Sequence, residues 1–263
     1  MLTVICNEPR SLTAVQSPIP ARQPGETLIR VKRVGVCGTD LHIFTGNQPF
    51  LEYPRVMGHE FSGIVEASDE GSGLVAGDVV YVMPYISCGT CIACSKGKTN
   101  CCTRIQVLGV HCDGAFTEYL SVAHQFIHKA DGVSLDQAAM IEFLSIGAHA
   151  VRRSNLQAGQ RVLVVGTGPI GMAAAIFAGL RGARVTVLDT RDDRLDFCRQ
   201  HLGIHAAVKI GEGDKDALAD LTEGDFYDVV FDATGNARAM ERGFEFIAHG
   251  GTYVMISVVR DSI

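Results

Sequence analysis

Hydrophobic and polar positions follow two different patterns along the 263-residue chain. Between residues 27 and 119, short β-rich runs are separated by glycine-containing turns, a pattern typical of an irregular β-barrel or sandwich. We expect strands over 28–36, 62–67, 78–83 and 115–122. From about residue 135 the pattern changes to a helix over 136–153 and then to strands that alternate with helices, which predicts a parallel, doubly wound α/β sheet.

The second part of the chain contains five predicted strands, at 161–165, 184–188, 206–210, 227–233 and 252–257. We therefore expect two domains, a β-rich one over residues 1–150 and an α/β one over residues 151–263. A complete dinucleotide-binding sheet has six strands, whereas this chain ends directly after the fifth. We expect the second domain to be incomplete, and these 263 residues alone to have little or no activity.

Composition and charge narrow the class of protein. Hydrophobic residues make up 47% of the chain and charged residues 20%, as in a globular protein. Twenty-nine acidic residues against 23 basic ones leave no positive field for a polyanion, so we expect no nucleic acid partner. The first residues do not resemble a secretory signal, which predicts a cytoplasmic location. The uncharged run 162–180 has the length of a membrane span, but its glycines and Pro169 favour a strand-to-helix turn instead, so we expect no membrane association.

A phosphate-binding pattern, G-x-G-x-x-G, lies between a predicted strand and a predicted helix, the context that this motif requires. In this chain the motif reads GTGPIG, and its candidate cofactor-binding residues are Gly166, Gly168, Pro169, Ile170 and Gly171. Its glycines allow a tight turn and the close approach of a pyrophosphate, which the free amides at the helix start would bind. Asp189 ends the next predicted strand, where a carboxylate would bind the adenosine ribose and repel a 2′-phosphate. NAD is therefore preferred over NADP. Arg194 is a further candidate contact to the cofactor. Arg191 and Arg194 follow Asp189 closely and are the residues most able to weaken the preference for NAD.

Four cysteines form the spacing C-x2-C-x2-C-x7-C, namely Cys88, Cys91, Cys94 and Cys102. In a reducing compartment such clusters bind metal more often than they form disulfides, and this spacing predicts a closed, structural zinc site. An iron–sulfur site would have its fourth cysteine where Lys98 stands. A nucleic-acid-binding zinc module would need a basic face and a second knuckle. The spacing alone leaves open whether Cys101 or Cys102 is the fourth ligand.

A second set of metal ligands is predicted from two shorter segments. Cys37 lies in VCGTDLH, and His59 and Glu60 follow Gly58. A thiolate, an imidazole and a carboxylate from separate loops make a three-ligand zinc site whose fourth position is open, as catalytic zinc requires. Asp40 is well placed to accept the other ring hydrogen of His59 and thereby to set its tautomer.

These motifs together resemble the zinc-containing medium-chain alcohol dehydrogenases. The resemblance rests on VCGTDLH, YPRVMGHEFSGIVE, SCGTCIACSKGKTNCC and GTGPIG, and it extends over essentially the whole chain. It implies a GroES-like catalytic domain joined to a Rossmann domain, with one catalytic and one structural zinc ion. It also implies that Cys37 and His59 bind the catalytic ion, and the alignment on Asn100 favours Cys102 over Cys101 at the structural one.

The third catalytic ligand is left open by the resemblance. Glu142, in MIEFLSIGAHAVRR, looks like the IEPL segment of the polyol and threonine dehydrogenase branch, although Phe143 replaces the expected proline. In that branch the positions of Glu60 and Glu142 are alternative ligands, one bound directly and the other through water or on exchange.

The resemblance also implies an activity. Zinc would act as a Lewis acid on the hydroxyl of a secondary alcohol, and a hydride would pass from a polyol or sugar acid to NAD. Thr39 and His42 resemble the family's proton relay, and Gly235 ends a segment that resembles the one near the nicotinamide. L-threonine oxidation, or a non-catalytic NAD-binding zinc protein, are the alternatives. The relatives form dimers or tetramers, so a homo-oligomer is expected for the full-length protein.

Overall fold

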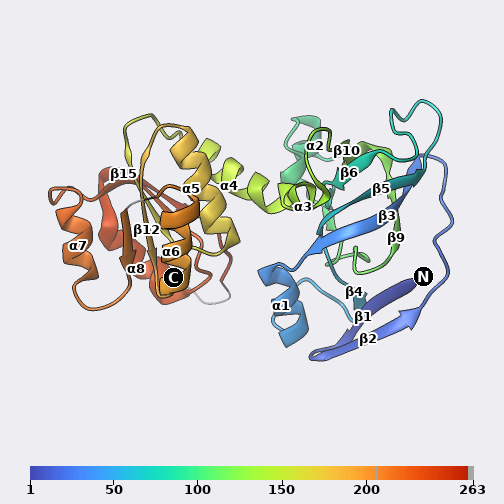
Figure 1. Ribbon diagram of the computed structural model, residues 1–263, viewed down its shortest axis with the longest axis horizontal. Coiled ribbons are helices and arrows are strands. Elements are labelled where there is room, and N and C mark those ends of the chain that lie inside the picture. Colours follow the sequence, from blue (N-terminus) through green and yellow to red (C-terminus); the bar gives the residue numbers. More distant parts are fainter. Residues whose placement is uncertain (205, 260–263) are drawn as a thin grey trace. The chain divides into compact units, whose positions relative to one another are not determined.

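The computed structural model describes residues 1–204 and 206–259 (Figure 1). The chain divides into two compact units, Met1–Glu142 and Phe143–Ile263. The division falls within helix α4 (Ile141–Arg153), which starts in the first unit and continues in the second.

The first unit is built from three antiparallel sheets. The largest has the order β10 (Ile127–Lys129), β6 (Val79–Val82), β5 (Glu60–Ala67), β3 (Glu26–Gly35) and β9 (Tyr119–Ala123). A second has the order β2 (Ser11–Gln16), β1 (Leu2–Glu8) and β4 (Arg55–Val56), and the third pairs β7 (Tyr85–Ile86) with β8 (Gln106–Val107). Its short helices are α1 (Gly38–Thr45), α2 (Ile92–Ser95), α3 (Leu135–Ala139) and the 3₁₀ turns Thr99–Cys101 and His124–Phe126.

The core of this unit lies against the largest sheet. Ile29, Phe61 and Val80 are almost completely buried there and come from the three adjacent strands β3, β5 and β6. This packing holds the end of β3 and the start of β5 side by side, since Gly35 pairs with Glu60. The four strands expected in this region correspond to β3, β5, β6 and β9.

Some elements of the first unit differ from the expectation. Strands β1 and β2 were not predicted, because only Thr3 and Cys6 are buried in β1 and none of the residues of β2 is buried, so no clear alternation marks them. The helix expected over 136–153 is two helices, α3 and α4, which meet at Met140. Ser134 caps the first of them, since its hydroxyl accepts a hydrogen bond from the Gln137 amide.

The second unit is a five-stranded parallel sheet covered by helices on both faces. Its strand order is β13 (Ala206–Lys209), β12 (Arg184–Asp189), β11 (Arg161–Val165), β14 (Tyr227–Asp232) and β15 (Ile247–Met255). The helices are α5 (Pro169–Leu180), α6 (Asp192–His201), α7 (Asp214–Asp220), α8 (Ala237–Gly243) and the 3₁₀ turn Phe244–Phe246. The predicted α/β class and the five parallel strands are confirmed. The last residues of the predicted domain, 260–263, lie outside the described part.

The sheet positions a ligand site because its strand order reverses around β11. The chain runs outward from β11 through β12 to β13, and then returns to the other side of β11 as β14. Ligands of such sheets bind where the carboxyl ends of these two neighbouring strands part. Val162 to Val165 of β11 are buried, so the strand forms the centre of the core and the turn after it starts from a rigid element.

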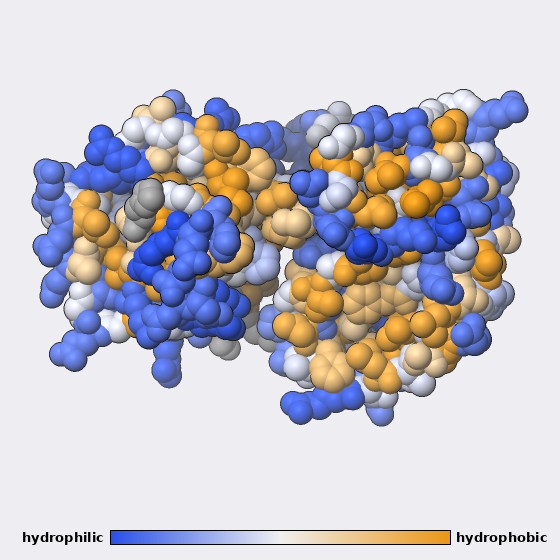
Figure 2. Space-filling view, in the orientation of Figure 1, coloured by the Kyte–Doolittle hydropathy of each residue, from blue (hydrophilic) through white to orange (hydrophobic). Residues whose placement is uncertain are grey.

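Some apolar residues of the first unit lie on its surface, and the longest apolar run of the second unit lies within its fold. Figure 2 shows apolar surface on the part of the first unit formed by β1, β2 and α1, where exposed apolar residues include Leu12 and Leu41. Across the described residues, no helix has both the length and the apolar character that crossing a membrane needs. The uncharged run 162–180 is instead the strand β11, a turn and helix α5.

Candidate functional site: two metal centres and a nucleotide cavity

Three metal-ligand side chains meet where β3, α1 and β5 converge. Cys37 precedes the first residue of α1, His59 precedes β5, and Glu60 is the first residue of β5. One potential ligand atom from each of them lies within 4.8 Å of the other two. His59 and Glu60 are only 5% and 6% exposed, and Cys37 is half-buried. Zinc–ligand bonds of about 2.0–2.3 Å require a spacing of this order.

Two glycines make room for this arrangement. A Cβ atom at Gly35 would collide with Oε2 of Glu60, so only glycine lets the Glu60 carboxylate lie across the end of β3. Gly58 has a φ of 94°, a conformation that favours glycine, and turns the chain so that His59 enters the site. Gly35 and Gly58 therefore provide the space and the backbone turn that the ligand side chains need.

Asp40 connects the two segments that carry the ligands. Its buried carboxylate accepts hydrogen bonds from the Cys37 amide at 2.8 Å and from the Gly58 amide at 3.3 Å. The nearer oxygen of Asp40 lies 3.9 Å from Nδ1 of His59, and Nδ1 has no hydrogen-bond partner in the described part of the chain. Asp40 thus lies near the imidazole without a hydrogen bond to it, and its role in orienting His59 stays a prediction.

The electrostatics of the three ligands favour a cation. Burial raises the pKa of the Cys37 thiol to about 12, and the adjacent Glu60 carboxylate acts in the same direction. Burial also raises the pKa of Glu60, while a hydrogen bond from Cys37 partly offsets this. The side chains of Cys37 and Glu60, whose negative charges would repel each other, are therefore held together away from solvent. A divalent cation reverses this penalty, and thiolate, imidazole and carboxylate are ligands that zinc accepts, so these residues fit zinc.

Glu142 lies beside this group but is not one of its three members. Its carboxylate is 6% exposed and accepts a hydrogen bond of 2.5 Å from the Tyr85 hydroxyl. Burial raises the pKa of Glu142, and the Tyr85 hydrogen bond opposes that shift. Of the two alternative carboxylates, the structure brings Glu60 together with Cys37 and His59.

The candidate relay residues both lie on α1. Thr39 is half-buried in its first turn, and its contacts with Cys37 lower the pKa of that thiol in part. His42 lies three residues further on and is exposed. Residues three apart lie on one side of a helix, so Thr39 and His42 run from the ligand Cys37 toward solvent.

The second metal centre consists of the four cysteines between β7 and β8. The sulfurs of Cys88, Cys91, Cys94 and Cys102 lie within 4.8 Å of one another. Among the described residues this group includes Cys102, which is buried, and not Cys101, which is exposed. The Cys102 sulfur accepts hydrogen bonds from the amides of Cys88 at 3.3 Å and Arg104 at 3.4 Å.

Nearby donors favour thiolates in this cluster. The Arg104 guanidinium, 3.4 Å from the Cys88 sulfur, lowers the pKa of Cys88 to about 5. Backbone hydrogen bonds, of which the Cys94 amide makes the strongest, lower the pKa of Cys91 to about 6. Burial and its hydrogen bond with Cys91 raise the pKa of Cys94 to about 11. Four sulfurs within 4.8 Å of one another, two of which ionise easily, fit a closed zinc site.

The nucleotide-binding pattern forms the turn between β11 and α5. Gly166 has a φ of 89°, and a Cβ atom at Gly171 would collide with the Gly166 carbonyl oxygen. Gly168 precedes the first helical residue, Pro169, whose ring suits that position. The turn borders a cavity of about 460 Å³. Its lining includes Gly166, Gly168, Asp189, Arg194, Thr234, Asn236, Arg238 and Arg242.

Not all candidate cofactor residues line this cavity. Pro169, Ile170 and Gly171 begin helix α5, and their role is to form the turn. Gly235 lies between the lining residues Thr234 and Asn236 without being one of them.

Asp189 reaches the cavity from the end of β12 and is held firmly there. Its carboxylate accepts hydrogen bonds from the Thr167 amide at 2.6 Å, the Thr167 hydroxyl at 2.8 Å and the Arg191 amide at 2.9 Å. Burial acts to raise the pKa of Asp189, but these hydrogen bonds outweigh it and hold the pKa below its usual range. Arg194 lies 3.9 Å from the same carboxylate. An ionised carboxylate at the cavity is therefore maintained.

Sequence reasoning missed the buried Thr167, which does not line the cavity, and two arginines that do. Thr167 occupies one of the variable positions of the motif, so no pattern marks its contact with Asp189. Arg238 and Arg242 lie four residues apart on α8, and that spacing is the only signal in the sequence that they share a helix face. Arg242 is also held by an ion pair with the buried Asp214.

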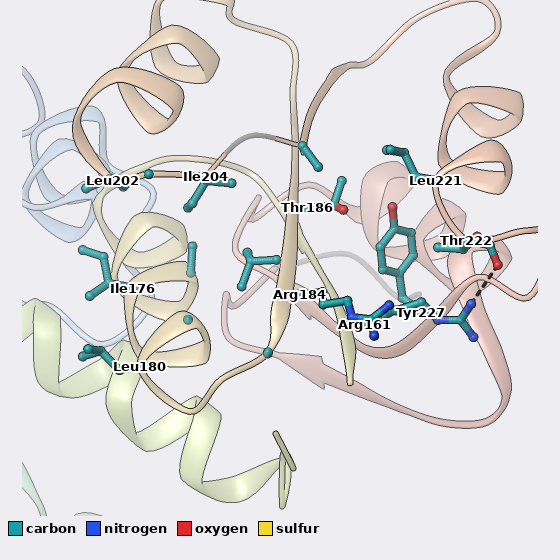
Figure 3. A pocket seen from close by; sticks show the side chains of 16 residues that line it. Arg161, Ile176, Leu180, Arg184, Thr186, Leu202, Ile204, Leu221, Thr222 and Tyr227 are labelled. Atoms are coloured by element: carbon teal, nitrogen blue, oxygen red, sulfur yellow. Dashed lines mark hydrogen bonds between the residues drawn. The ribbon is translucent and has the colours of Figure 1, made fainter. Parts of the chain in front are cut away.

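A further cavity of the second unit, of about 540 Å³, lies at the opposite end of the strands (Figure 3). Its lining includes Arg161, Arg184 and Tyr227, the first residues of β11, β12 and β14. The Arg161 guanidinium donates to the Thr222 carbonyl oxygen at 2.7 Å, as Figure 3 shows. Because cofactors bind at the carboxyl ends of such strands, we assign this cavity no part in the nucleotide site.

Comparisons with known proteins agree with these observations. The model of the alcohol dehydrogenase GroES-like domain matches residues 23–132, and that of the zinc-binding dehydrogenases matches residues 169–263. The L-galactonate-5-dehydrogenase of Escherichia coli K12 is 44% identical over all of this chain and 78% of its own length. The chain belongs to the zinc-binding alcohol dehydrogenases. The predicted GroES-like and Rossmann fold and the resemblance to this family are confirmed.

Other members of the family are similar along most of their length. The sorbitol dehydrogenase of Bacillus subtilis is 32% identical over 98% of this chain and 75% of its own. The crystal structure of galactitol-1-phosphate dehydrogenase from Escherichia coli has a TM-score of 0.90, with 25% identity, over 100% of this chain and 77% of its own. The structure of an Escherichia coli CFT073 alcohol dehydrogenase with the cofactor NADH has a TM-score of 0.88, with 32% identity, over 96% of this chain and 75% of its own. The relatives named here are dehydrogenases, and one of the solved structures holds the cofactor NADH.

Proposed function

We propose that this protein is a zinc-dependent oxidoreductase that transfers a hydride from a secondary alcohol of a polyol or sugar acid to NAD. The observation that supports this proposal is the group of Cys37, His59 and Glu60, whose potential ligand atoms lie within 4.8 Å of one another and would form a zinc ligand set with an open position. The substrate class is supported by the relatives named as L-galactonate-5-dehydrogenase and sorbitol dehydrogenase.

The three proposed ligand residues would have different roles at the metal site. When bound, zinc supplies Lewis acidity that makes an alcohol hydroxyl easier to deprotonate. Cys37 and Glu60 would supply two negative charges, which balance the ion, while His59 would supply a ring nitrogen and Asp40, 3.9 Å away, would help to orient the ring. Burial of the group excludes water and strengthens each of these interactions.

Thr39 and His42 are proposed to carry the substrate proton away. The half-buried Thr39 hydroxyl would pass the proton outward from the ligand site, and the exposed His42 imidazole would release it to solvent.

The second unit is proposed to bind NAD in the 460 Å³ cavity. Amides at the start of α5, after Gly168, would bind the pyrophosphate. The ionised Asp189 would accept hydrogen bonds from the ribose hydroxyls and repel a 2′-phosphate, which favours NAD over NADP. Arg194 and Gly235 are proposed as further contacts.

The test combines metal analysis, cofactor titration and a turnover screen. The zinc-replete protein is expected to hold two zinc ions per chain and to bind NAD more tightly than NADP, and the extended version described below is expected to reduce NAD with polyols or sugar acids. The screen includes L-threonine, because threonine dehydrogenases are among the relatives, at 34% identity. It is run on this chain and on a version extended by the remaining segment of L-galactonate-5-dehydrogenase.

The possible outcomes separate the alternatives. Turnover of L-threonine but of no polyol or sugar acid would contradict the proposed substrate class. Zinc and NAD binding without turnover in either version would favour a non-catalytic NAD-binding zinc protein. A chain that binds no zinc at Cys37 would contradict the proposal as a whole.

We also propose a domain boundary, a cellular location and an oligomeric state. The functional domains meet near residue 150, the enzyme acts in the cytoplasm, and the complete enzyme is a homo-oligomer. Light scattering of the extended version checks the last of these, and a monomer at micromolar concentration would contradict it.

A further inference from the structure

The hydrogen bond between Tyr85 and Glu142 joins two elements that are 57 residues apart in the chain. Tyr85 is the first residue of β7, and its backbone is held in register with Val107 of β8. Glu142 lies in the first turn of α4. The hydroxyl donates to Oε1 at 2.5 Å, and the carboxylate is almost fully buried. This contact is therefore short, dry and anchored on both sides.

Both partners lie within electrostatic reach of the candidate zinc ligands. Cys37 and Glu60 act on Tyr85 and raise the pKa of its hydroxyl, together with burial and Glu142 itself. His59, Glu60 and Asp40 in turn act on the Glu142 carboxylate. Two carboxylates, Glu60 and Glu142, are thus close to the same place, although only Glu60 belongs to the group of three ligands.

The position of Glu60 follows from the backbone. The register of β3 and β5 places Glu60 opposite Gly35, and the missing Cβ of that glycine leaves space for the carboxylate. Glu142 lies in a helix, and in the part of the chain that the structure describes its carboxylate is held by a side chain, through the hydrogen bond from Tyr85. The Tyr85 hydroxyl is therefore well placed to set the direction of Glu142.

We propose that Tyr85 is a positioning residue whose hydroxyl holds Glu142 outside the coordination sphere of the catalytic zinc, so that Glu60 is the third ligand and the fourth position stays open. This inference rests on the proposed function, because it concerns the same metal site. Its physical reason is charge. A Cys37 thiolate and a Glu60 carboxylate already balance a divalent ion, and a second carboxylate in a dry site would leave a net negative charge and occupy the place of the substrate hydroxyl.

The experiment replaces the catalytic zinc by Co²⁺, whose visible absorption depends on the number and kind of its ligands. The variants are Tyr85→Phe, which removes only the hydroxyl, Glu142→Gln, which removes the anionic ligand, and the double variant. Tyr81→Phe is the matched control, since Tyr81 lies on β6 and stacks on His128. The four-cysteine site contributes equally to all spectra, so differences between variants report on the site with Cys37.

Tyr85→Phe is expected to change the Co²⁺ spectrum, because the released Glu142 carboxylate would take the fourth position in place of a water or substrate oxygen. Because Glu142 would add a fourth protein ligand, loss of this metal to a chelator is expected to be slower in Tyr85→Phe than in the wild type. The double variant is expected to match Glu142→Gln, because the shift requires the free Glu142 carboxylate. Tyr81→Phe is expected to match the wild type, and circular dichroism checks that each variant is folded.

Two results would overturn the inference alone. One is a Tyr85→Phe spectrum identical to that of the wild type, with two metal ions bound in both proteins. The other is a spectral shift that persists unchanged in the double variant, since Glu142 would then have no part in it. A wild-type protein that holds metal only at the four cysteines would instead overturn the proposed function and this inference with it.

Discussion

The contact between Thr167 and Asp189 allows a quantitative test of how the nucleotide site is built. Thr167 is fully buried, and its amide and hydroxyl both donate to the same oxygen of Asp189. Substituting Thr167→Val removes the hydroxyl bond of 2.8 Å and keeps the amide bond and the β-branched shape. A hydrogen bond to a charged group contributes about 1.5–3 kcal/mol, so the variant is expected to lose about that much unfolding free energy.

The pH dependence of this loss has a definite sign. The pKa of Asp189 in the folded protein is lowered, so its contribution to stability is full above the usual aspartate pKa of about 3.9 and is lost as the pH falls through the folded-state value. The difference in stability between wild type and Thr167→Val is therefore expected to be constant between about pH 5 and pH 8 and to narrow only below about pH 4.

Cofactor binding is expected to change in parallel. Thr167 connects the Gly166 turn to the Asp189 carboxylate that would bind the ribose. Thr167→Val removes one of the hydrogen bonds that hold this carboxylate in place for NAD. That corresponds to an NAD dissociation constant about 2- to 10-fold higher. Urea denaturation measures the stability and NAD fluorescence titration measures the affinity. Thr186→Val is the matched control, because Thr186 is buried in the same sheet and faces the neutral side chain of Tyr227. Equal stability losses in the two variants, with unchanged NAD affinity, would refute the reasoning.

Three further predictions concern the metal centres. Gly35→Ala introduces a Cβ that collides with the Glu60 carboxylate, so zinc affinity at the site with Cys37 should fall by about tenfold while the four-cysteine site stays loaded; metal analysis after dialysis checks this. Cys102→Ser should lose the structural zinc and lower the melting temperature, whereas Cys101→Ser should change neither, and equal losses in both would contradict the assignment. Arg104→Gln removes the cation that lowers the pKa of Cys88 to about 5, so protons compete with the metal at higher pH and the midpoint of acid-induced zinc release should rise; an unchanged midpoint argues against this role.

Local signals in the sequence predict much of this protein. The turn between β11 and α5 is specified by the glycines of one six-residue motif and by the apolar strand before it, because both act over short distances. The spacing of Cys88, Cys91 and Cys94 likewise needs only a short loop that turns back on itself. The alternation of strands and helices after residue 160 predicts the parallel sheet, since strands buried on both faces must be uniformly apolar.

Other features depend on contacts between distant segments. Strand β2 has no buried residue, so its pairing with β1 leaves no hydrophobic pattern to read. Cys101 and Cys102 are neighbours in the chain, and only the fold buries one of them in the sulfur cluster and exposes the other.

The choice between Glu60 and Glu142 shows the same limit most clearly. Both are glutamates in motifs that resemble metal-binding segments, and their chemistry is identical. The space beside Gly35 and the hydroxyl of Tyr85 distinguish them, and each is brought to its glutamate by strand pairing or by packing rather than by proximity in the chain. The amino-acid sequence therefore determines which ligand chemistry is present, whereas the tertiary structure decides which carboxylate reaches the metal, because a hydrogen bond and a steric gap exist only between surfaces that folding has brought together.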